Sequence, residues 1–220
     1  ALVRGVLDNE DITHSAELWE KIVEMGWLGT AIDEEHGGLG LGMLELCVMA
    51  EELGRTLAPV PFSSSVYLFA EAVKNFGKDS QKSSLLPQVI SGELIGCLAT
   101  SEGPGAPNSS ALTTEFNGST LSGKKLPVTD GDIATHALVL AKEGDSASVV
   151  IVDLNGAGVT RKTLKTLDPT RSHAEITFTN VPAQRLGAAG AGAEILDNTL
   201  DRAAILFAFE QLGGASRCLE

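Results

Sequence analysis

The chain has 220 residues, of which 43% are hydrophobic, enough to form a sizeable core in one or two domains. Its 29 acidic and 16 basic residues give a formal net charge of -13, which argues against a surface that binds the backbone of a nucleic acid. Neither end has a signal-peptide pattern, and no apolar run approaches the roughly 18 residues that cross a bilayer, so we expect a cytoplasmic protein without a membrane span.

Residues 1–92 are predicted to form an N-terminal helical domain. Apolar residues recur at helical spacing in "SAELWEKIVEMGWLG", "GMLELCVMAEELGR", "SSSVYLFAEAVKNFG" and "KSSLLPQVISGE". Glycines and prolines fall between these segments, as expected at helix ends. Ser15 is a predicted N-cap for the helix that contains Leu18 and Trp19.

Residues 93–187 are predicted to form a small antiparallel β-barrel or sandwich. Seven short segments are rich in β-branched residues at a period of two: "ELIGCLATSE", "ALTTEF", "STLSGKKLPVTD", "THALVLAKE", "SASVVIVDL", "GVTRKTL" and "HAEITFTNV". Within "EFNGST", the Asn117-Gly118 pair favours a tight hairpin turn. No helix alternates with the strands, which disfavours a parallel nucleotide-binding sheet. The glycine-rich "LGAAGAGAEIL" that follows is therefore predicted to be a flexible link into a helix.

Residues 188–220 are predicted to form the first helix of a C-terminal helical bundle. The helical period returns in residues 193–220, and their segment "AAILFAF" is apolar around nearly the whole helix, which is typical of a bundle interior. A helix of this kind needs neighbours, which either more of the natural chain or another subunit would supply. The opening "ALVRGV" likewise begins mid-pattern without a cap, so we expect the chain to be a fragment cut at both ends. The predicted fold class is therefore α+β.

Cysteine and histidine residues show no spacing that suits a metal site. The three cysteines are widely separated in apolar sequence and are expected to be small buried hydrophobic residues: Cys47, Cys97 and Cys218. The four histidines are expected to have structural or surface roles: His14, His36, His136 and His173.

Several stretches of the sequence resemble the acyl-CoA dehydrogenase family. "GWLGTAIDEEHGGLGLGMLELCVMAEELGR" resembles the family's Gly-Gly-Leu-Gly turn between two helices, and "LPQVISGELIGCLATSEGPG" its passage into the β domain. "GKKLPVTDG" is similar to the family's Gly-x-Lys-x-Trp-Ile-Thr-Asn-Gly motif. "EITFTNVPAQRLG" resembles its exit strand, and "LDRAAILFAFEQLGGASRCLE" the start of its C-terminal bundle. These stretches occur in the family's order through most of the chain.

The resemblance implies a flavoprotein that uses FAD to remove two hydrogens across the α and β carbons of an acyl-CoA thioester. A carboxylate takes the α proton while a hydride leaves the β carbon for N5 of the flavin. Members of the family form tetramers, so a homo- or hetero-oligomer is expected. An electron-transfer flavoprotein or a similar acceptor is the implied redox partner.

The resemblance also assigns the cofactor-binding residues. Thr129 matches the threonine whose hydroxyl binds the flavin near N5, and Val128 before it would offer backbone groups. Ser101 matches a hydroxyl residue on the pyrimidine side of the ring, and Thr100 and Leu98 are further candidates. For Thr100 and Leu98, an ordinary place in a strand is an equal alternative.

Two prolines depart from the family pattern. Pro107 lies in the glycine-rich loop "EGPGAPNSS" and removes an amide donor that could bind phosphate. Pro127 replaces a tryptophan that would pack on the ring. These departures leave open a second interpretation, a non-catalytic structural subunit of a heteromeric acyl-CoA dehydrogenase. A flavin-dependent oxidase or oxygenase on the same fold is a third.

The catalytic base is not assigned within this chain. Asp201 falls where a minority of family members place their catalytic glutamate, but aspartate is one methylene shorter. In most members the base lies further along, so we expect it beyond Glu220. Arg202 aligns with an arginine near the family's CoA-binding region and is the predicted substrate-binding residue; its alternative is a solvated or ion-paired helix residue.

Overall fold

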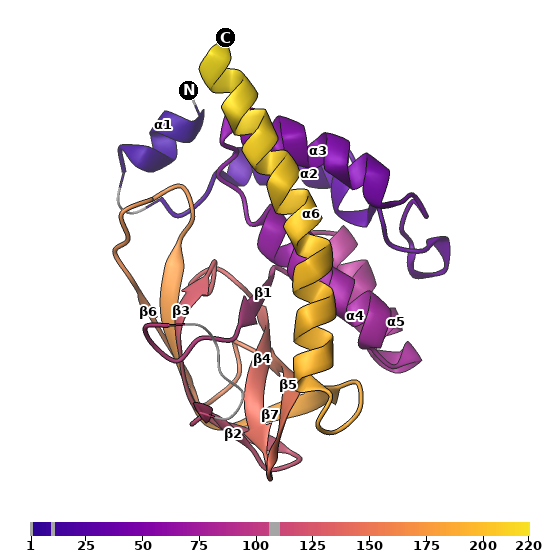
Figure 1. The fold of residues 1–220 in the computed structure, drawn as a ribbon, viewed down its shortest axis with the longest axis vertical. Helices are drawn as coiled ribbons and strands as arrows, with labels where there is room; N and C mark the ends of the chain where they lie inside the picture. The colour runs from indigo at the N-terminus through magenta and orange to yellow at the C-terminus, as the bar shows by residue number, and fades with distance from the viewer. Residues whose placement is uncertain (1, 10–11, 106–110) are drawn as a thin grey trace.

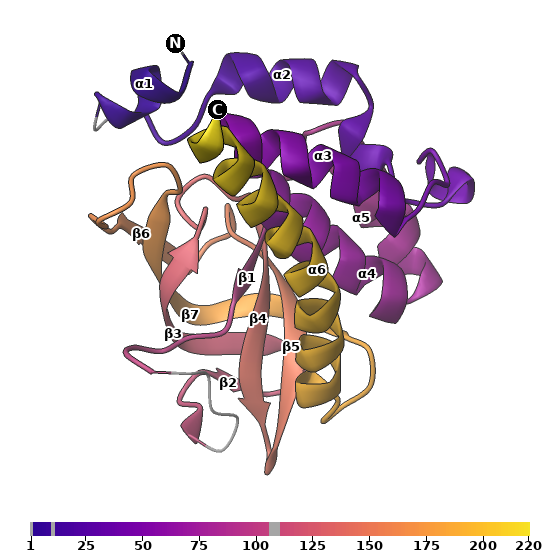
Figure 2. The ribbon, with the colours of Figure 1, turned by 45° about the horizontal axis from the view of Figure 1, so that its top comes forward.

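The computed structural model describes residues 2–9, 12–105 and 111–220, in which a layer of helices covers one side of a small barrel. Figures 1 and 2 show the helices that precede the barrel grouped at one end of the molecule and the strands at the other, with α6 running along both. The helices before the barrel are α1 (Leu2–Leu7), α2 (Ala16–Glu24), α3 (Met43–Thr56), the π-helical segment η3 (Ser63–Ala70), α4 (Glu71–Phe76) and α5 (Asp79–Ile90), with the 3-10 turns η1 (Trp27–Gly29) and η2 (Glu34–His36). Among the described helices, none combines the length and the apolar character needed to cross a membrane.

Helix α2 begins where the sequence predicts. The Ser15 side chain accepts a hydrogen bond from the backbone N–H of Leu18 at 3.3 Å, so the predicted N-cap is confirmed. Trp19 and Ile22 lie three positions apart on the buried face of the helix. They belong to a core cluster that also contains residues of α3, η3 and the last helix of the chain.

The seven predicted strands are all present and form one closed sheet. They are β1 (Gly96–Ala99), β2 (Glu115–Phe116), β3 (Thr120–Thr129), β4 (His136–Glu143), β5 (Ser146–Asp153), β6 (Val159–Thr163) and β7 (His173–Leu186). The strand order is β1-β4-β2-β3-β7-β5; pairing of β5 with β4 closes the barrel, and β6 pairs with β7.

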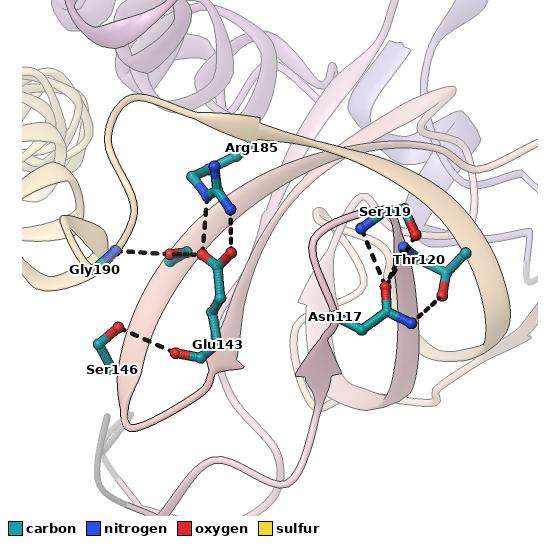
Figure 3. Close-up of polar contacts among 8 residues, drawn as sticks. Asn117, Ser119, Thr120, Glu143, Ser146, Arg185 and Gly190 are labelled. Atoms are coloured by element: carbon teal, nitrogen blue, oxygen red, sulfur yellow. Dashed lines mark hydrogen bonds and ion pairs between the residues drawn. The ribbon is translucent and has the colours of Figure 1, made fainter.

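The barrel is not wholly antiparallel, which corrects the prediction. Strand β4 runs parallel to β1 and to β2, while the other pairs are antiparallel. Parallel neighbours require a long connection between them, and the β2–β3 hairpin supplies it between β1 and β4. The predicted hairpin itself is confirmed: Asn117 Oδ1 accepts hydrogen bonds from the N–H groups of Ser119 at 3.1 Å and Thr120 at 2.8 Å (Figure 3).

Strands β4 and β5 are buried on both faces. In β4, Val139 points into the barrel core, whereas its neighbours Leu138 and Leu140 pack with helical residues such as Val73 and Leu86. Alternate side chains of a strand therefore pack into two different cores, one inside the barrel and one between the strands and the helices. This explains why the segment "THALVLAKE" is almost continuously apolar.

Helix α6 (Gly192–Leu219) extends from beside β5 to beside α3, as both ribbon views show. The helices α3 and α6 touch through their backbones where Gly54 faces Glu210 and Gly213 faces Glu51. A Cβ atom at Gly213 would lie 1.9 Å from the Glu51 carbonyl oxygen, so only glycine fits there. Since α6 packs on both helices and strands, the division of the chain at residues 92 and 187 stays a prediction.

The link between β7 and α6 is hydrogen-bonded to the barrel, while its flexibility stays a prediction. The Ser148 hydroxyl accepts a hydrogen bond from Gly190 N–H at 3.0 Å and donates one to Glu143 Oε2 at 2.5 Å. Glu143 also pairs with Arg185 through both carboxylate oxygens, and Figure 3 shows Arg185 bonded to Glu143 directly and Gly190 linked to it through an intervening hydroxyl. This chain of contacts fixes the start of α6 against the barrel.

The cysteines match the prediction only in part. Cys47 and Cys97 are buried, as expected from their apolar surroundings. Cys218 is exposed, because the core contacts of α6 end before its last turn. Among the described residues, no group of histidine, cysteine and carboxylate side chains could hold a metal ion.

Candidate functional site

The ends of β1 and β3 meet at one end of the barrel. The N–H of Leu126 donates to the Ser101 carbonyl at 2.9 Å, and Glu102 forms an isolated parallel bridge with Leu126. The segments 98–102 and 126–129, which the sequence assigns to cofactor binding, are thereby brought together. Leu126 and Ser101 are both half-buried, and Pro127 between Leu126 and Val128 is exposed.

A buried ion pair lies beneath this junction. Lys125 Nζ donates to Glu102 Oε1 at 2.8 Å and to the Thr100 carbonyl at 3.1 Å, and the Lys125 side chain is completely buried. Burial lowers the pKa of Lys125, and the bond to Glu102 opposes that shift. Burial alone would raise the pKa of Glu102, but hydrogen bonds from Lys125 and Thr113 outweigh it and lower the pKa to about 2. The pair therefore remains charged and joins the ends of β1 and β3.

Thr129 is the last residue of β3 and points out of the barrel. Val128 before it is completely buried in the barrel core, so the alternation of the strand turns Thr129 to the opposite side, where it is half-buried. The Val128 carbonyl accepts a hydrogen bond from Gly131 N–H at 3.2 Å. The Thr129 hydroxyl lies 3.2 Å from Nε2 of His173, its partner in the β3–β7 register.

The turn after Thr129 anchors the helices to the barrel. Asp130 has a positive φ of 56° and is buried, and the Ser64 hydroxyl on η3 donates to its Oδ2 at 2.6 Å. Burial raises the pKa of Asp130, while the bond from Ser64 and the charge of Arg171 act in the opposite direction. Thr129 therefore lies beside the junction of the helical layer and the barrel.

The remaining predicted residues are divided between two places. Thr100 and Leu98 lie at the end of β1, where Leu98 packs against the core between the strands and the helices. Arg202 lies elsewhere, on α6, and its Nε pairs with the buried Glu71 at the start of α4. Asp201 on the same helix is exposed. The ion pair of Arg202 supports the alternative that it is an ion-paired helix residue; its part in substrate binding stays a prediction.

One residue that the sequence did not single out belongs to the site. His173 is 44 positions from Thr129 and was expected to be structural or on the surface. The sequence predicts a strand that begins at His173, but it does not predict which residues of β3 lie opposite that strand. The predicted loop residue Pro107 lies outside the described residues.

The fold of this chain consists of a helical layer, a small closed barrel and a long helix that packs on both. A family model described as the acyl-CoA dehydrogenase N-terminal domain matches residues 4–93. The mitochondrial isovaleryl-CoA dehydrogenase of Solanum tuberosum is 30% identical over 92% of this chain and 53% of its own length. The chain belongs to the acyl-CoA dehydrogenase family.

Solved structures agree in fold. A Tcur3481-Tcur3483 steroid ACAD is 33% identical with a TM-score of 0.85, over 99% of this chain and 58% of that one. Butyryl-CoA dehydrogenase from Megasphaera elsdenii is 26% identical with a TM-score of 0.85, over 94% of this chain and 59% of that one. The chain thus spans about half the length of the curated relatives it matches, at 53% for the potato enzyme.

Proposed function

We propose that the whole protein is an FAD-dependent dehydrogenase that introduces a double bond between the α and β carbons of an acyl-CoA thioester. The observation that carries this proposal is the half-buried Thr129 hydroxyl, which points outward at the barrel end beside the Ser101 segment. The relatives, named as isovaleryl-CoA and butyryl-CoA dehydrogenases, support the same reaction class.

The residues at this end of the barrel fit the polar edge of a flavin. Thr129 and Ser101 supply hydroxyl groups, which can donate or accept hydrogen bonds, and Val128 and Thr100 supply backbone groups. The hydrogen bond from the Leu126 N–H to the Ser101 carbonyl keeps the two segments in a fixed register, which a binding site requires. FAD held by these residues would supply the acceptor for the hydride that leaves the substrate's β carbon.

Within this proposal, the chain's residues hold and orient the reactants. Thr129, Val128, Ser101, Thr100 and Leu98 bind the cofactor. Arg202 contributes to the CoA region, where its pairing with Glu71 would fix its direction. The carboxylate that takes the α proton is expected outside residues 1–220. Orientation of this kind supplies a large part of the rate in such reactions, up to roughly 7 to 11 kcal/mol of barrier.

A substitution at Thr129 tests the proposal. The full-length protein should purify with the visible absorbance of bound flavin and reduce a dye when given an acyl-CoA. Thr129→Val keeps the shape of the side chain but removes its hydroxyl, so we expect reduced flavin to bind about 3- to 10-fold more weakly, in line with the loss of one hydrogen bond. Thr179→Val, at an exposed position on β7, is the matched control and should bind flavin normally. A wild-type protein that takes up no flavin, alone or with a partner chain, would refute the proposal.

A second function is favoured by Pro127. The exposed proline stands where the family motif has an aromatic that would pack on the ring, so this chain offers less stacking surface. A structural subunit of a heteromeric dehydrogenase would tolerate that loss. One structural neighbour is a steroid ACAD whose name, Tcur3481-Tcur3483, has two components. Co-expression with the product of the neighbouring gene separates the two functions. Flavin that appears only in the complex, and that Thr129→Val does not affect, would support the structural subunit.

The remaining features of the family belong to the same proposal. They are a tetrameric or heteromeric assembly, an electron-transfer flavoprotein or similar redox partner, and a cytoplasmic location. A single measurement of the mass of the assembly in solution, together with reduction assays on the candidate acceptor, tests the first two.

A further inference from the structure

We propose that His173 is a positioning residue that fixes the direction of the Thr129 hydroxyl, so that its oxygen faces the flavin as a hydrogen-bond acceptor. The inference rests on the proposed function, because it concerns the flavin edge that Thr129 is proposed to bind. It concerns two residues that lie opposite each other in the β3–β7 ladder.

The hydrogen bonds of His173 determine which atom donates. Nδ1 of His173 lies 3.1 Å from the Arg171 carbonyl, which can only accept, so Nδ1 carries the proton. In the neutral form of the ring there is a single N–H, so in that form Nε2 is an acceptor. The group 3.2 Å from Nε2 is the Thr129 hydroxyl, which in that form donates its only hydrogen to the ring.

The two residues before His173 are bonded to neighbouring elements, which helps to hold the His173 backbone opposite Thr129. Arg171 donates to the Val60 carbonyl at 2.6 Å and lies 3.3 Å from Glu210 Oε2 on α6. The Ser172 hydroxyl donates to Asp132 Oδ1 at 2.6 Å, and the Ser172 carbonyl accepts from Asp130 N–H at 2.8 Å. The elements packed at this end of the barrel thus hold His173 in register with Thr129.

The Thr129 hydroxyl can then act toward a ligand only as a hydrogen-bond acceptor. A threonine hydroxyl has one hydrogen and two lone pairs, and the hydrogen is used by His173. Only lone pairs remain for a ligand. N5 of an oxidised flavin presents a lone pair, whereas N5 of the reduced flavin presents an N–H. The Thr129–His173 pair should therefore bind reduced flavin better than oxidised flavin.

The test measures the reduction potential of the bound flavin in the full-length protein with its partner chain. His173→Phe keeps an aromatic ring but removes the acceptor, which frees the Thr129 hydrogen. We expect the preference for reduced over oxidised flavin to fall about tenfold, or ~30 mV for a two-electron couple. His173→Gln, whose amide oxygen can accept the hydroxyl hydrogen, should restore part of the preference.

A double-mutant cycle shows whether His173 acts through Thr129. In a Thr129→Val background, His173→Phe should leave the potential unchanged, because the valine has no hydroxyl to orient. The matched control is His136→Phe, which removes the imidazole from a second Thr–His contact, 3.2 Å from Thr135 Oγ1 to His136 Nδ1, at the start of β4. An equal shift with and without the Thr129 hydroxyl, or no shift at all, would overturn the inference.

A second readout needs no flavin. Nitrogen NMR of the imidazole in the flavin-free protein should show His173 with the proton on Nδ1. A proton on Nε2 would overturn the inference even if flavin binds. A wild-type protein that binds no flavin refutes the proposed function instead, so the two failures are distinguishable.

Discussion

Lys125 Nζ lies 2.8 Å from Glu102 Oε1, and the Lys125 side chain is completely buried while that of Glu102 is 16% exposed. The carboxylate also accepts hydrogen bonds from the backbone N–H groups of Thr113 at 2.8 Å and Thr114 at 3.0 Å. Among the described residues, Lys125 donates to Glu102 and to the Thr100 carbonyl alone. The Lys125 ammonium therefore depends more on Glu102 than the Glu102 carboxylate depends on Lys125.

This inequality predicts different costs for the two single substitutions. Glu102→Gln leaves a buried ammonium without its counter-charge and should lower the free energy of unfolding by about 3 to 5 kcal/mol. Lys125→Met leaves a carboxylate with other donors and should cost about 1 to 3 kcal/mol. Urea unfolding measures both values. The neighbouring Lys124, 3.4 Å from Glu175 at the surface, is the control, and Lys124→Met should change stability by less than about 1 kcal/mol. Equal losses at Glu102 and Lys125 would contradict the unequal dependence.

The same ion pair predicts a loss of stability in acid. The pKa of Glu102 is about 2 in the folded protein, against about 4.3 for an unfolded glutamate. Between these values the unfolded chain binds more protons, so the free energy of unfolding should fall as the pH decreases from about 5 to about 2. Urea unfolding at several pH values should show a shallower fall for Lys125→Met than for the wild type. Parallel curves for the two proteins would show that Lys125 does not lower the pKa of Glu102.

Asp130 predicts a pH effect of the opposite sign. Its pKa is raised by burial, so its folded form binds a proton more readily than the unfolded chain does. The contribution of Asp130 to stability is therefore complete below its unfolded pKa and is lost as the pH rises through its folded pKa. Asp130→Asn retains an acceptor for the Ser64 hydroxyl and tolerates the positive φ of 56°.

We accordingly expect Asp130→Asn to stabilise the protein at neutral pH by roughly 1 kcal/mol and to have less effect near pH 4. Thermal unfolding at the two pH values is the measurement. Ser64→Ala, which removes the donor to Asp130, should destabilise the wild type more than it destabilises the variant. A variant less stable than the wild type at neutral pH would mean that the Asp130 carboxylate is well accommodated in the folded protein.

Two adjacent glycines in α6 predict opposite effects of alanine. At Gly213 a Cβ atom would lie 1.9 Å from the Glu51 carbonyl, so Gly213→Ala must push α6 away from α3 and should cost about 1 to 3 kcal/mol or more. At Gly214 the nearest atom to a Cβ would be the Gly54 carbonyl at 3.7 Å, an ordinary contact. Gly214→Ala should therefore stabilise by about 0.5 to 1 kcal/mol through helix propensity. Differential scanning calorimetry of both variants tests this, and a stabilising Gly213→Ala would show that the two helices do not touch as described.

The sequence predicted candidate site residues only where they lie in short motifs. Thr129, Val128 and Ser101 lie in stretches that resemble family motifs, and the structure brings the segments containing them together. His173 was not predicted as part of the site, because its contact with Thr129 spans 44 positions and depends on the register of two strands. The ion pair between Lys125 and Glu102 spans 23 positions and was missed for the same reason.

The sequence by itself determined the local elements of this protein. The Ser15 cap, the Asn117 hairpin and the change from helical to strand-like spacing near residue 93 depend on interactions between residues a few positions apart, which propensity and hydrogen bonding of single side chains decide. The tertiary structure alone decided the parallel placement of β4, the hydrogen-bonded link before α6 and the contact between Thr129 and His173. Each of these depends on contacts between residues far apart in the sequence, which form when the two cores are buried. The periodicity of the sequence does not specify such contacts.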